Sequence, residues 1–449
     1  MDAFRITGGR ALRGTLRIGG AKNAALPLMA AALLTEEPVT LDDVPELADI
    51  ANMQRLLAEL GCESDRSGRT LALRTTNPDL RHARYDIVRT MRASIGALGP
   101  LLAARGGARL SMPGGCAIGE RPVDIHLRGL QSLGARIDLK EGDIVATAPE
   151  GGRLIGARVF LGGPNGPTVL GTANILSAAT LAVGQTIIEH AACEPEIVNL
   201  AELLTAMGAR IRGAGTPRIV VDGVDRLSGA SIRLIPDRIE AGTYLAATAA
   251  AGGDVTLENC PLDALMAALD RLERMGVSVE PLGGSDPMRM TCRVRRTGPI
   301  RPVQITTQPH PGFPTDLQAQ FAAALTLATG NSVVTERIFP QRFLHVAELS
   351  RMGAEMYRQG ATVVISGVPR LIGAPVMASD LRASAGLVIA GLAAEGVTTV
   401  HRVYHIDRGY EKIEERLATL GALIERVDSE EAMAARLAVA ARSVQPASA

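Results

Sequence analysis

A cysteine lies in the most unusual loop of this chain, residues 112–124 (MPGGCAIGERPVD). Three glycines favour an exposed, flexible turn, and Arg121 followed by Pro122 is typical of a helix with proline in its first turn. A helix start and a nearby arginine both stabilise a thiolate. We therefore expect Cys116 to donate or accept a proton near neutral pH, as a general acid does.

Cations recur where apolar, small-residue helices are predicted to begin. The residues at these six helix starts are Lys22 with Asn23, Arg92, residues 168–172, Arg238, Asp316 and Arg382. The helix dipole disfavours a cation there by about 0.3–1 kcal/mol, so an anion should compensate. Free N–H groups beside lysine or arginine bind phosphate or carboxylate. Pairing of each arginine with a surface carboxylate is the alternative, but the repeated position favours an anion site.

The standard motifs for phosphate, metal or serine chemistry are missing from the sequence. Residues 19–22 (GGAK) lack the spacing and the Lys-Ser/Thr end of a P-loop, and no Gly-x-Gly-x-x-Gly follows a predicted strand. No pair of histidines has zinc-ligand spacing with a third donor nearby, so we expect no metal site. A serine hydrolase is unsupported, because no Gly-x-Ser-x-Gly motif occurs. The anion should be held by dispersed side chains.

Two further segments carry candidate acids and cations. Residues 309–316 (PHPGFPTD) hold three prolines before a helix whose first acid is Asp316. Because an aspartate there is also an ordinary helix cap, its facing partners must decide its role. Residues 404–413 place His405, Asp407 and Arg408 at a turn between strand and helix. Residues 339–345, with Arg342, are their counterpart one repeat earlier.

A sixfold repeat supplies the elements that must position these residues. Each copy has an amphipathic helix that ends in Leu-Gly or Met-Gly and runs into a strand, with the glycines at positions 61, 134, 208, 276, 353 and 421. The glycine is a predicted helix C-cap. A second, small-residue helix and a strand precede each copy. One repeat is thus helix, strand, helix, strand, over about 70 residues.

Six repeats predict an α/β protein with two domains, at residues 20–235 and 236–427. The first strand, before Gly19, should complete the second domain, and residues 428–449 should form a flexible tail. Two crossings between the domains would make a hinge, where substrate should bind. The uncharged small-residue helices suit burial inside a ring of sheets.

Composition excludes several classes of function. Lysine plus arginine and aspartate plus glutamate number 47 each, and aromatic residues make up only 2%, which argues against nucleic-acid binding. Five widely spaced cysteines argue against a disulfide framework, and four of them should be small buried hydrophobes. No apolar run reaches the ~20 residues of a membrane span. Because the chain reads straight into a strand at residues 4–6, we expect no secretory signal and a cytoplasmic protein.

Eight segments resemble, in family order, the UDP-N-acetylglucosamine enolpyruvyl transferases. They are residues 20–25 (GAKNAA), 91–94 (MRAS), 113–119 (PGGCAIG), 121–124 (RPVD), 236–240 (PDRIE), 313–318 (FPTDLQ), 380–384 (DLRAS) and 405–410 (HIDRGY). The likeness implies an inside-out α/β barrel with three repeats in each domain. It implies transfer of the enolpyruvyl group of phosphoenolpyruvate to the 3-hydroxyl of UDP-N-acetylglucosamine, with release of phosphate. This is the first committed step of peptidoglycan synthesis, with no cofactor, metal, membrane or nucleic-acid partner, in a monomer.

The resemblance also implies roles for individual residues. Cys116 corresponds to the thiol that protonates the methylene carbon and is the target of epoxide antibiotics, and Asp316 to the group that deprotonates the acceptor hydroxyl. The implied phosphoenolpyruvate-binding residues, of which Lys22 and Arg408 are also catalytic, are Lys22, Asn23, Arg121, Arg342, Arg382 and Arg408. The implied acceptor-binding residues are Asn23, Arg92, Arg121, Pro122, Val123, Asp124, Ile125, Thr168, Val169, Asp316 and Ile338.

The chain departs from the family pattern mainly on the acceptor side. Gly96 stands where the family carries a large aromatic residue, and residues 168–172 read TVLGT in place of SVGAT. Cys193 replaces a common arginine, and residues 340–341 (PQ) replace an acidic-amide pair. A paralogue that acts on another uridine nucleotide, such as UMP in nucleoside-antibiotic synthesis, is therefore an alternative. A catalytically idle homologue and a shikimate-pathway enzyme are less favoured, because the catalytic residues and the Pro-Gly-Gly-Cys loop are retained.

Overall fold

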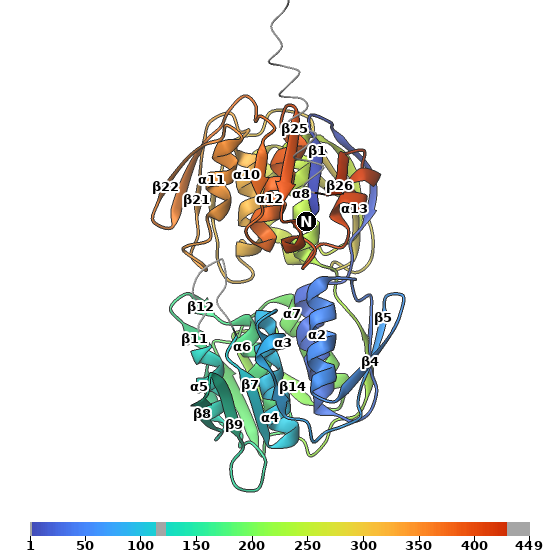
Figure 1. Cartoon of the computed structure of the whole chain (residues 1–449), viewed down its shortest axis with the longest axis vertical. Helices are drawn as coiled ribbons and strands as arrows, with labels where there is room; N and C mark the ends of the chain where they lie inside the picture. The colour runs from blue at the N-terminus through green and yellow to red at the C-terminus, as the bar shows by residue number, and fades with distance from the viewer. Residues whose placement is uncertain (1, 114–122, 429–449) are drawn as a thin grey trace, which may run out of the picture. The chain divides into compact units, whose positions relative to one another are not determined.

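The computed structural model describes residues 2–113 and 123–428. Contacts divide this chain into two compact units (Figure 1). We call residues 19–237 with 308–312 the Lys22 unit, and the remaining described residues the Asp316 unit. The repeats alone place residues 308–312 with the second set. They group with the Lys22 unit, where the His310 N–H lies 3.3 Å from a Glu194 carboxylate oxygen that accepts its hydrogen bond.

The Lys22 unit has three four-stranded sheets in its described part. In spatial order they are β16 (Ala230–Arg233), β3 (Val39–Asp42), β5 (Thr70–Thr75) and β4 (Cys62–Ser67); β6 (His82–Ala83), β7 (Gly107–Ser111), β9 (Asp143–Thr147) and β8 (Arg136–Lys140); and β10 (Arg158–Phe160), β13 (Gln185–Glu189), β15 (Arg218–Asp222) and β14 (Arg210–Arg212). A small hairpin joins β11 (Gly162–Gly163) to β12 (Gly166–Pro167). The helices are α1 (Lys22–Ala31), η1 (Ala32–Leu34), α2 (Ala48–Glu59), α3 (Tyr85–Val88), η2 (Arg92–Ala97), α4 (Leu98–Arg105), α5 (Asp124–Ser132), α6 (Val169–Ala179) and α7 (Pro195–Ala206).

The Asp316 unit repeats this plan in its described residues. Its sheets are β24 (Pro375–Met377), β25 (Val397–His401), β1 (Asp2–Thr7) and β26 (Leu423–Asp428); β18 (Val277–Gly283), β19 (Met290–Arg296), β17 (Gly253–Cys260) and β2 (Leu12–Arg17); and β20 (Gln304–Thr306), β21 (Asn331–Thr335), β23 (Thr362–Ser366) and β22 (Glu355–Gln359). Its helices are α8 (Arg238–Ala251), η3 (Asp263–Leu265), α9 (Met266–Met275), η4 (Thr315–Leu317), α10 (Gln318–Leu325), α11 (Leu344–Arg351), α12 (Leu381–Ala393), η5 (Val403–His405) and α13 (Ile413–Thr419). The N-terminal strands lie here, with β1 between β25 and β26 and β2 beside β17.

Every one of these sheets has the same mixed pairing. One edge strand runs parallel to its neighbour and the other pairs are antiparallel, as in β16 with β3 and then β3 with β5. The strand expected after each amphipathic helix is a hairpin of two strands, such as β4 and β5. The strand predicted directly after Gly61 is β4, whereas its hairpin partner β5 was not predicted as a separate strand. Because β4 (CESDRS) is mostly exposed and lacks apolar alternation, the sequence does not show where one strand ends and the next begins.

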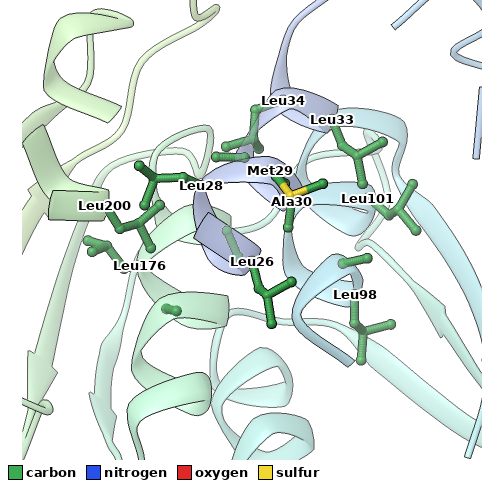
Figure 2. Packing of buried hydrophobic residues seen from close by; sticks show 14 of the residues in the cluster. Leu26, Leu28, Met29, Ala30, Leu33, Leu34, Leu98, Leu101, Leu176 and Leu200 are labelled. Atoms are coloured by element: carbon green, nitrogen blue, oxygen red, sulfur yellow. The ribbon is translucent and has the colours of Figure 1, made fainter. Parts of the chain in front are cut away.

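The small-residue helices form the interior of each unit. In the Asp316 unit α8, α10 and α12 pack against one another (Figure 1). In the Lys22 unit the buried Leu28, Leu98 and Leu176 come from α1, α4 and α6 (Figure 2). Each such leucine contributes about 1.5–3 kcal/mol by burial. With helices inside and sheets outside, the expected inside-out α/β architecture is confirmed.

The repeat glycines end the amphipathic helices as predicted. Their φ angles lie between 76° and 106°, a left-handed range that glycine adopts without strain. After Gly134, the Ala135 N–H bonds the Leu130 carbonyl, and the Gly134 N–H bonds the Gln131 carbonyl. This is the Schellman arrangement, which satisfies carbonyl groups at a helix end. Among the described residues, no helix combines the length and apolar character needed to cross a membrane.

Candidate functional site

The predicted helix-start residues lie at the first turns of the interior helices. Helix α1 begins at Lys22, the turn η2 at Arg92 and helix α8 at Arg238. Thr168 caps α6, because its hydroxyl accepts a hydrogen bond from the Gly171 N–H at 3.2 Å. The cations therefore sit where exposed N–H groups of a helix can also face a bound anion.

Lys22 is a buried cation held in place by acidic partners of its own unit. Its side-chain Nζ lies 3.1 Å from a carboxylate oxygen of Asp49, and Asp49 is only 2% exposed. The Lys22 backbone N–H bonds Asp237 at 3.2 Å. Two buried opposite charges at hydrogen-bond distance fix the direction of the ammonium group. The Lys22 ammonium group is thereby held against Asp49 at the start of α1, and the neighbouring Asn23 is half-buried.

Asp316 accepts hydrogen bonds from two buried arginines. Arg342 Nη1 lies 2.7 Å from Asp316 Oδ1, and Arg382 Nε lies 3.3 Å from Asp316 Oδ2. The arginine side chains are 7% and 2% exposed, whereas the carboxylate is 26% exposed. Two buried guanidinium groups thus bind one carboxylate that is partly open to solvent. The arrangement suits an anionic ligand beside a solvent-accessible base.

The facing partners settle whether Asp316 is an ordinary cap. Asp316 lies within η4, and the N-cap position of that turn is Pro314, with no side-chain cap bond. Asp380 is a true cap by contrast, because it accepts hydrogen bonds from Arg382 N–H and Ala383 N–H at 3.0 and 3.1 Å. The carboxylate of Asp316 is directed to Arg342 of its own repeat and to Arg382 of the next repeat, and not to the N–H groups of its own helix.

Glu336 is a buried residue of this site that sequence reasoning missed. It is 0% exposed, and its two oxygens accept four hydrogen bonds, at 2.7–2.9 Å. The donors are the hydroxyls of Thr307 and Thr315 and the backbone N–H groups of Ile338 and Phe339. Thr315 in turn accepts a bond from Arg342 at 3.0 Å. Its only signal in the sequence was an acid after a β-strand pattern, which is common on surfaces.

A second buried hydrogen-bond network holds the backbone of Asp316. Gln320 Nε2 donates to the Asp316 carbonyl at 2.8 Å and lies 3.2 Å from the Tyr410 hydroxyl. The Tyr410 hydroxyl is 2.8 Å from Thr243 Oγ1, and the Arg382 guanidinium lies over the Tyr410 ring at 5.2 Å from its centroid. Cation–π contact and hydrogen bonds together hold the arginine and the η4 turn.

Within residues 405–408, Asp407 has a structural role and Arg408 remains a candidate substrate-binding residue. Asp407 is bound by Arg426 through two hydrogen bonds of 2.6 and 3.1 Å, and these raise the pKa of Arg426 above its usual range. Asp407 thus serves structure. Arg408 is half-buried beside it. Burial and the nearby positive charge of Arg408 lower the pKa of His405, which keeps that imidazole neutral near pH 7.

Most of the described acceptor candidates lie in the Lys22 unit. Asp124 and Ile125 open helix α5, after the buried Val123, and a Cβ on Gly163 would lie 2.7 Å from Ile125 Cδ1. Gly163 belongs to the hairpin that leads into Thr168 and the half-buried Val169. The α5 start and the α6 start are therefore brought together. Ile338 lies in the Asp316 unit, where it is half-buried.

Gly96 lies on the η2 turn and has room for a side chain. A Cβ at this position would have no heavy atom within 4 Å among the described residues. Most interior glycines differ: a Cβ at Gly99 would meet the Asn174 carbonyl at 2.3 Å. Gly96 thus has open space beside it, on the same turn as Arg92.

Three predicted site residues, Cys116, Arg121 and Pro122, lie outside the described residues. The four described cysteines are all free. Cys62, Cys260 and Cys292 are buried as expected, but Cys193 is half-buried, because it follows a turn before α7. Burial raises the pKa of Cys62 to about 11 and also raises that of Cys193. These two thiols are therefore poor acids near neutral pH. Among the described residues, no cluster of His, Cys, Asp and Glu could hold a metal ion.

His345 gives the Asp316 site a pH-dependent stability. It is 1% exposed, and neither ring nitrogen has a hydrogen-bond partner within residues 2–113 and 123–428. Burial lowers the pKa of His345 to about 4, against a partial opposing effect of Asp380, with Arg342 and Arg358 adding to the shift. Below about pH 6.5 His345 takes up a proton in the unfolded chain, whereas in the folded chain it stays neutral until the pH falls to about 4. The free energy of unfolding is therefore highest above pH 6.5 and falls as the pH is lowered from 6.5 to 4.

We expect His345→Phe to flatten this pH profile. At pH 5 protonation of His345 in the unfolded chain lowers the wild-type free energy of unfolding by about 2 kcal/mol. This corresponds to a decrease of roughly 4–8 °C in melting temperature. Thermal unfolding at pH 7 and pH 5 should show a larger drop for the wild type than for the variant by about this amount. Equal drops in the two proteins would contradict the assignment.

Comparison with known proteins places the geometry in context. The family model described as EPSP synthase (3-phosphoshikimate 1-carboxyvinyltransferase) matches residues 6–417. A UDP-N-acetylglucosamine 1-carboxyvinyltransferase of Xanthobacter autotrophicus is 54% identical, over 95% of this chain and 100% of its own length. A UDP-N-acetylglucosamine 1-carboxyvinyltransferase 1 of Mesorhizobium japonicum is 52% identical, over 96% and 100%.

Solved structures show the same architecture. The enolpyruvyl transferase NikO from Streptomyces tendae aligns with a TM-score of 0.83 at 25% identity, and 95% of this chain and 99% of that one are covered. EPSP synthase from Acinetobacter baumannii aligns with a TM-score of 0.72 at 18% identity, over 95% and 100% of the two chains. The second likeness concerns the fold alone.

Proposed function

Because the chain belongs to the EPSP synthase family of enolpyruvyl transferases, we propose that it transfers the enolpyruvyl group of phosphoenolpyruvate to the 3-hydroxyl of UDP-N-acetylglucosamine and releases phosphate. The observation that carries this proposal is the identity of 52–54%, over nearly the whole chain, with relatives named for that acceptor. We place the reaction in the cytoplasm, at the first committed step of peptidoglycan synthesis, and expect a monomer.

The reaction has an addition step and an elimination step. In the addition step Asp316 takes the proton of the acceptor hydroxyl, and the hydroxyl oxygen forms a bond to C2 of phosphoenolpyruvate. The electron pair of the double bond moves to C3, which receives a proton from Cys116. In the second step the Cys116 thiolate takes a proton back from C3, the double bond re-forms and the C2–O bond to phosphate breaks. The departing phosphate takes the proton held by Asp316, which restores both side chains. Atoms and charges balance, with inorganic phosphate as the second product.

The cations supply the electrostatic part of the proposal. In the Asp316 unit, Arg342 and Arg382 would bind the carboxylate of phosphoenolpyruvate, since both already turn toward the Asp316 carboxylate. Lys22, Arg121 and Arg408 would bind its phosphate, with Asn23 close to Lys22. Fixed cations stabilise the charge that develops on the departing phosphate, because they need no reorganisation.

The acceptor side would be built from the Lys22 unit. We assign Arg92, Val123 to Ile125, Thr168 and Val169 to the nucleotide sugar, together with Arg121, Pro122 and, from the Asp316 unit, Asp316 and Ile338. The close approach of the α5 start to the hairpin before Thr168 supports a shared binding surface.

Open space at Gly96 favours one alternative, an enolpyruvyl transferase for another uridine nucleotide such as UMP. An aromatic side chain there could cover part of the sugar. The two functions are distinguished by phosphate release from phosphoenolpyruvate, measured with UDP-N-acetylglucosamine, UMP and other uridine nucleotides. We expect UDP-N-acetylglucosamine to give the highest kcat/KM.

Gly96→Trp should lower the KM for UDP-N-acetylglucosamine about fivefold. Covering about 40 Å² of sugar at about 25 cal/mol per Å² gives about 1 kcal/mol. Gly283→Trp is the matched control, because Gly283 also has open space among the described residues but lies on an exposed strand of the other unit. Its KM should not change. An unchanged KM in Gly96→Trp, with faster turnover of UMP by the wild type, would establish the alternative.

A further inference from the structure

A single buried amide, that of Asn174, joins three elements of the Lys22 unit. Asn174 lies on α6 and is 1% exposed. Its Nδ2 lies 3.0 Å from the Ile95 carbonyl and 3.1 Å from His126 Nδ1, and its Oδ1 lies 2.5 Å from the Gly99 N–H. These partners belong to η2, α5 and α4 respectively. The amide therefore uses both N–H donors and its oxygen.

The hydrogen bonds fix both the amide orientation and the histidine tautomer. Only the Asn174 oxygen can accept from the Gly99 N–H, and only its nitrogen can donate to the Ile95 carbonyl. With this orientation the amide nitrogen must also be the donor to His126 Nδ1. Nδ1 is then the unprotonated nitrogen, so a neutral His126 carries its proton on Nε2.

Two of the elements joined by Asn174, η2 and α5, carry proposed acceptor residues, as does its own helix α6. Ile95 lies three residues after Arg92 and directly before Gly96 on η2. His126 directly follows Ile125 on α5, and Asn174 lies on the helix that Thr168 caps. A buried polar group with all its bonds made holds its neighbours in one arrangement, because losing any bond leaves an unsatisfied group.

We propose that Asn174 is a positioning residue that sets the spacing of the three acceptor-binding segments. This inference rests on the proposed function for its substrate, but it concerns a side chain outside the predicted site. Asn174 acts through η2, α5 and the start of α6. Loss of the Asn174 amide should weaken binding of the nucleotide sugar, whose proposed contacts span all three segments, more than it weakens binding of phosphoenolpyruvate.

Asn174→Leu tests this directly, because leucine has a similar volume and makes none of the bonds. We expect the KM for UDP-N-acetylglucosamine to rise about tenfold, with the KM for phosphoenolpyruvate changed less than twofold. Thr180→Val is the matched control. Thr180 is equally buried and lies at the C-terminal cap of α6, where its hydroxyl donates to the Ser177 carbonyl at 2.7 Å. Its loss should lower the melting temperature without changing either KM.

Asn174→Asp separates positioning from simple loss of folding. Aspartate keeps the shape and the bond to Gly99, but it pairs with His126 only when Nδ1 carries a proton. The ratio of variant to wild-type KM for UDP-N-acetylglucosamine should therefore fall at least threefold from pH 8.5 to pH 6. Nitrogen-15 NMR spectra of wild-type protein with labelled histidines should show an unprotonated Nδ1 at His126. The His126 signal is assigned by its absence from the spectrum of the His126→Gln variant.

Two results would overturn the inference in different ways. A wild type that turns over UDP-N-acetylglucosamine, with an unchanged KM in a folded Asn174→Leu variant, would overturn the positioning role and leave the proposed function intact. A wild type that neither binds UDP-N-acetylglucosamine in calorimetry nor turns it over would overturn the proposed function, and the inference with it.

Discussion

Asp316→Asn should lower kcat with UDP-N-acetylglucosamine by about 10²–10⁴-fold, the usual contribution of a general base. Asparagine has nearly the same shape and its oxygen can still accept a bond from Arg342, which lies 2.7 Å from the carboxylate in the wild type. The amide cannot take the proton of the acceptor hydroxyl. Steady-state phosphate release at saturating substrates measures the effect.

Asp254→Asn is the matched control for that experiment. Asp254 also binds an arginine in the Asp316 unit, through two hydrogen bonds from Arg293, but it lies on strand β17 of an outer sheet. Its kcat should stay within twofold of wild type. A comparable loss in both variants, or full activity in Asp316→Asn, would refute the base assignment.

Cys116→Ala should also lower kcat about 10²–10⁴-fold, with both KM values nearly retained, because it removes the proposed proton donor to C3. Cys116→Asp should recover much of this activity, since a carboxyl group can also carry the proton. Single-turnover kinetics would separate a slow addition step from slow product release. Full activity in the alanine variant would remove Cys116 from the mechanism.

Thiol chemistry gives this prediction an independent readout. An epoxide should alkylate Cys116 in the wild type and inactivate it, and should spare the Cys116→Asp variant. Cys193 is the internal control, because it is half-buried and its pKa is raised, so it should react far more slowly. Peptide mass spectrometry after limited exposure identifies the labelled residue. Labelling at Cys193 in preference to Cys116 would contradict the expected reactivity.

The scaffold could be predicted from the sequence because its information is local and repeated. The glycine at position 134 and its five equivalents mark helix ends through a backbone conformation that glycine favours. The uncharged helices indicate burial from composition alone. The second strand of the β4–β5 hairpin was not predicted, because the exposed β4 carries no apolar period that would show where one strand ends and the next begins.

The candidate site could be predicted only in part. Asp316 and Arg382 belong to recognisable motifs, but their pairing joins residues 66 positions apart and needed the structure. Glu336 and Asn174 have no motif, and their importance comes from which backbone groups surround them after folding. Residue roles implied by resemblance therefore stay predictions until the variants above are measured.

The proposed reaction is best tested by the identity of its product. Purified protein should be incubated with phosphoenolpyruvate carrying carbon-13 at C3 and with UDP-N-acetylglucosamine, and the product analysed by mass spectrometry and NMR. We expect one phosphate released per turnover and a labelled methylene group in an enol ether on the sugar 3-oxygen. Attachment at another position, or no transfer to this acceptor while UMP is converted, would contradict it.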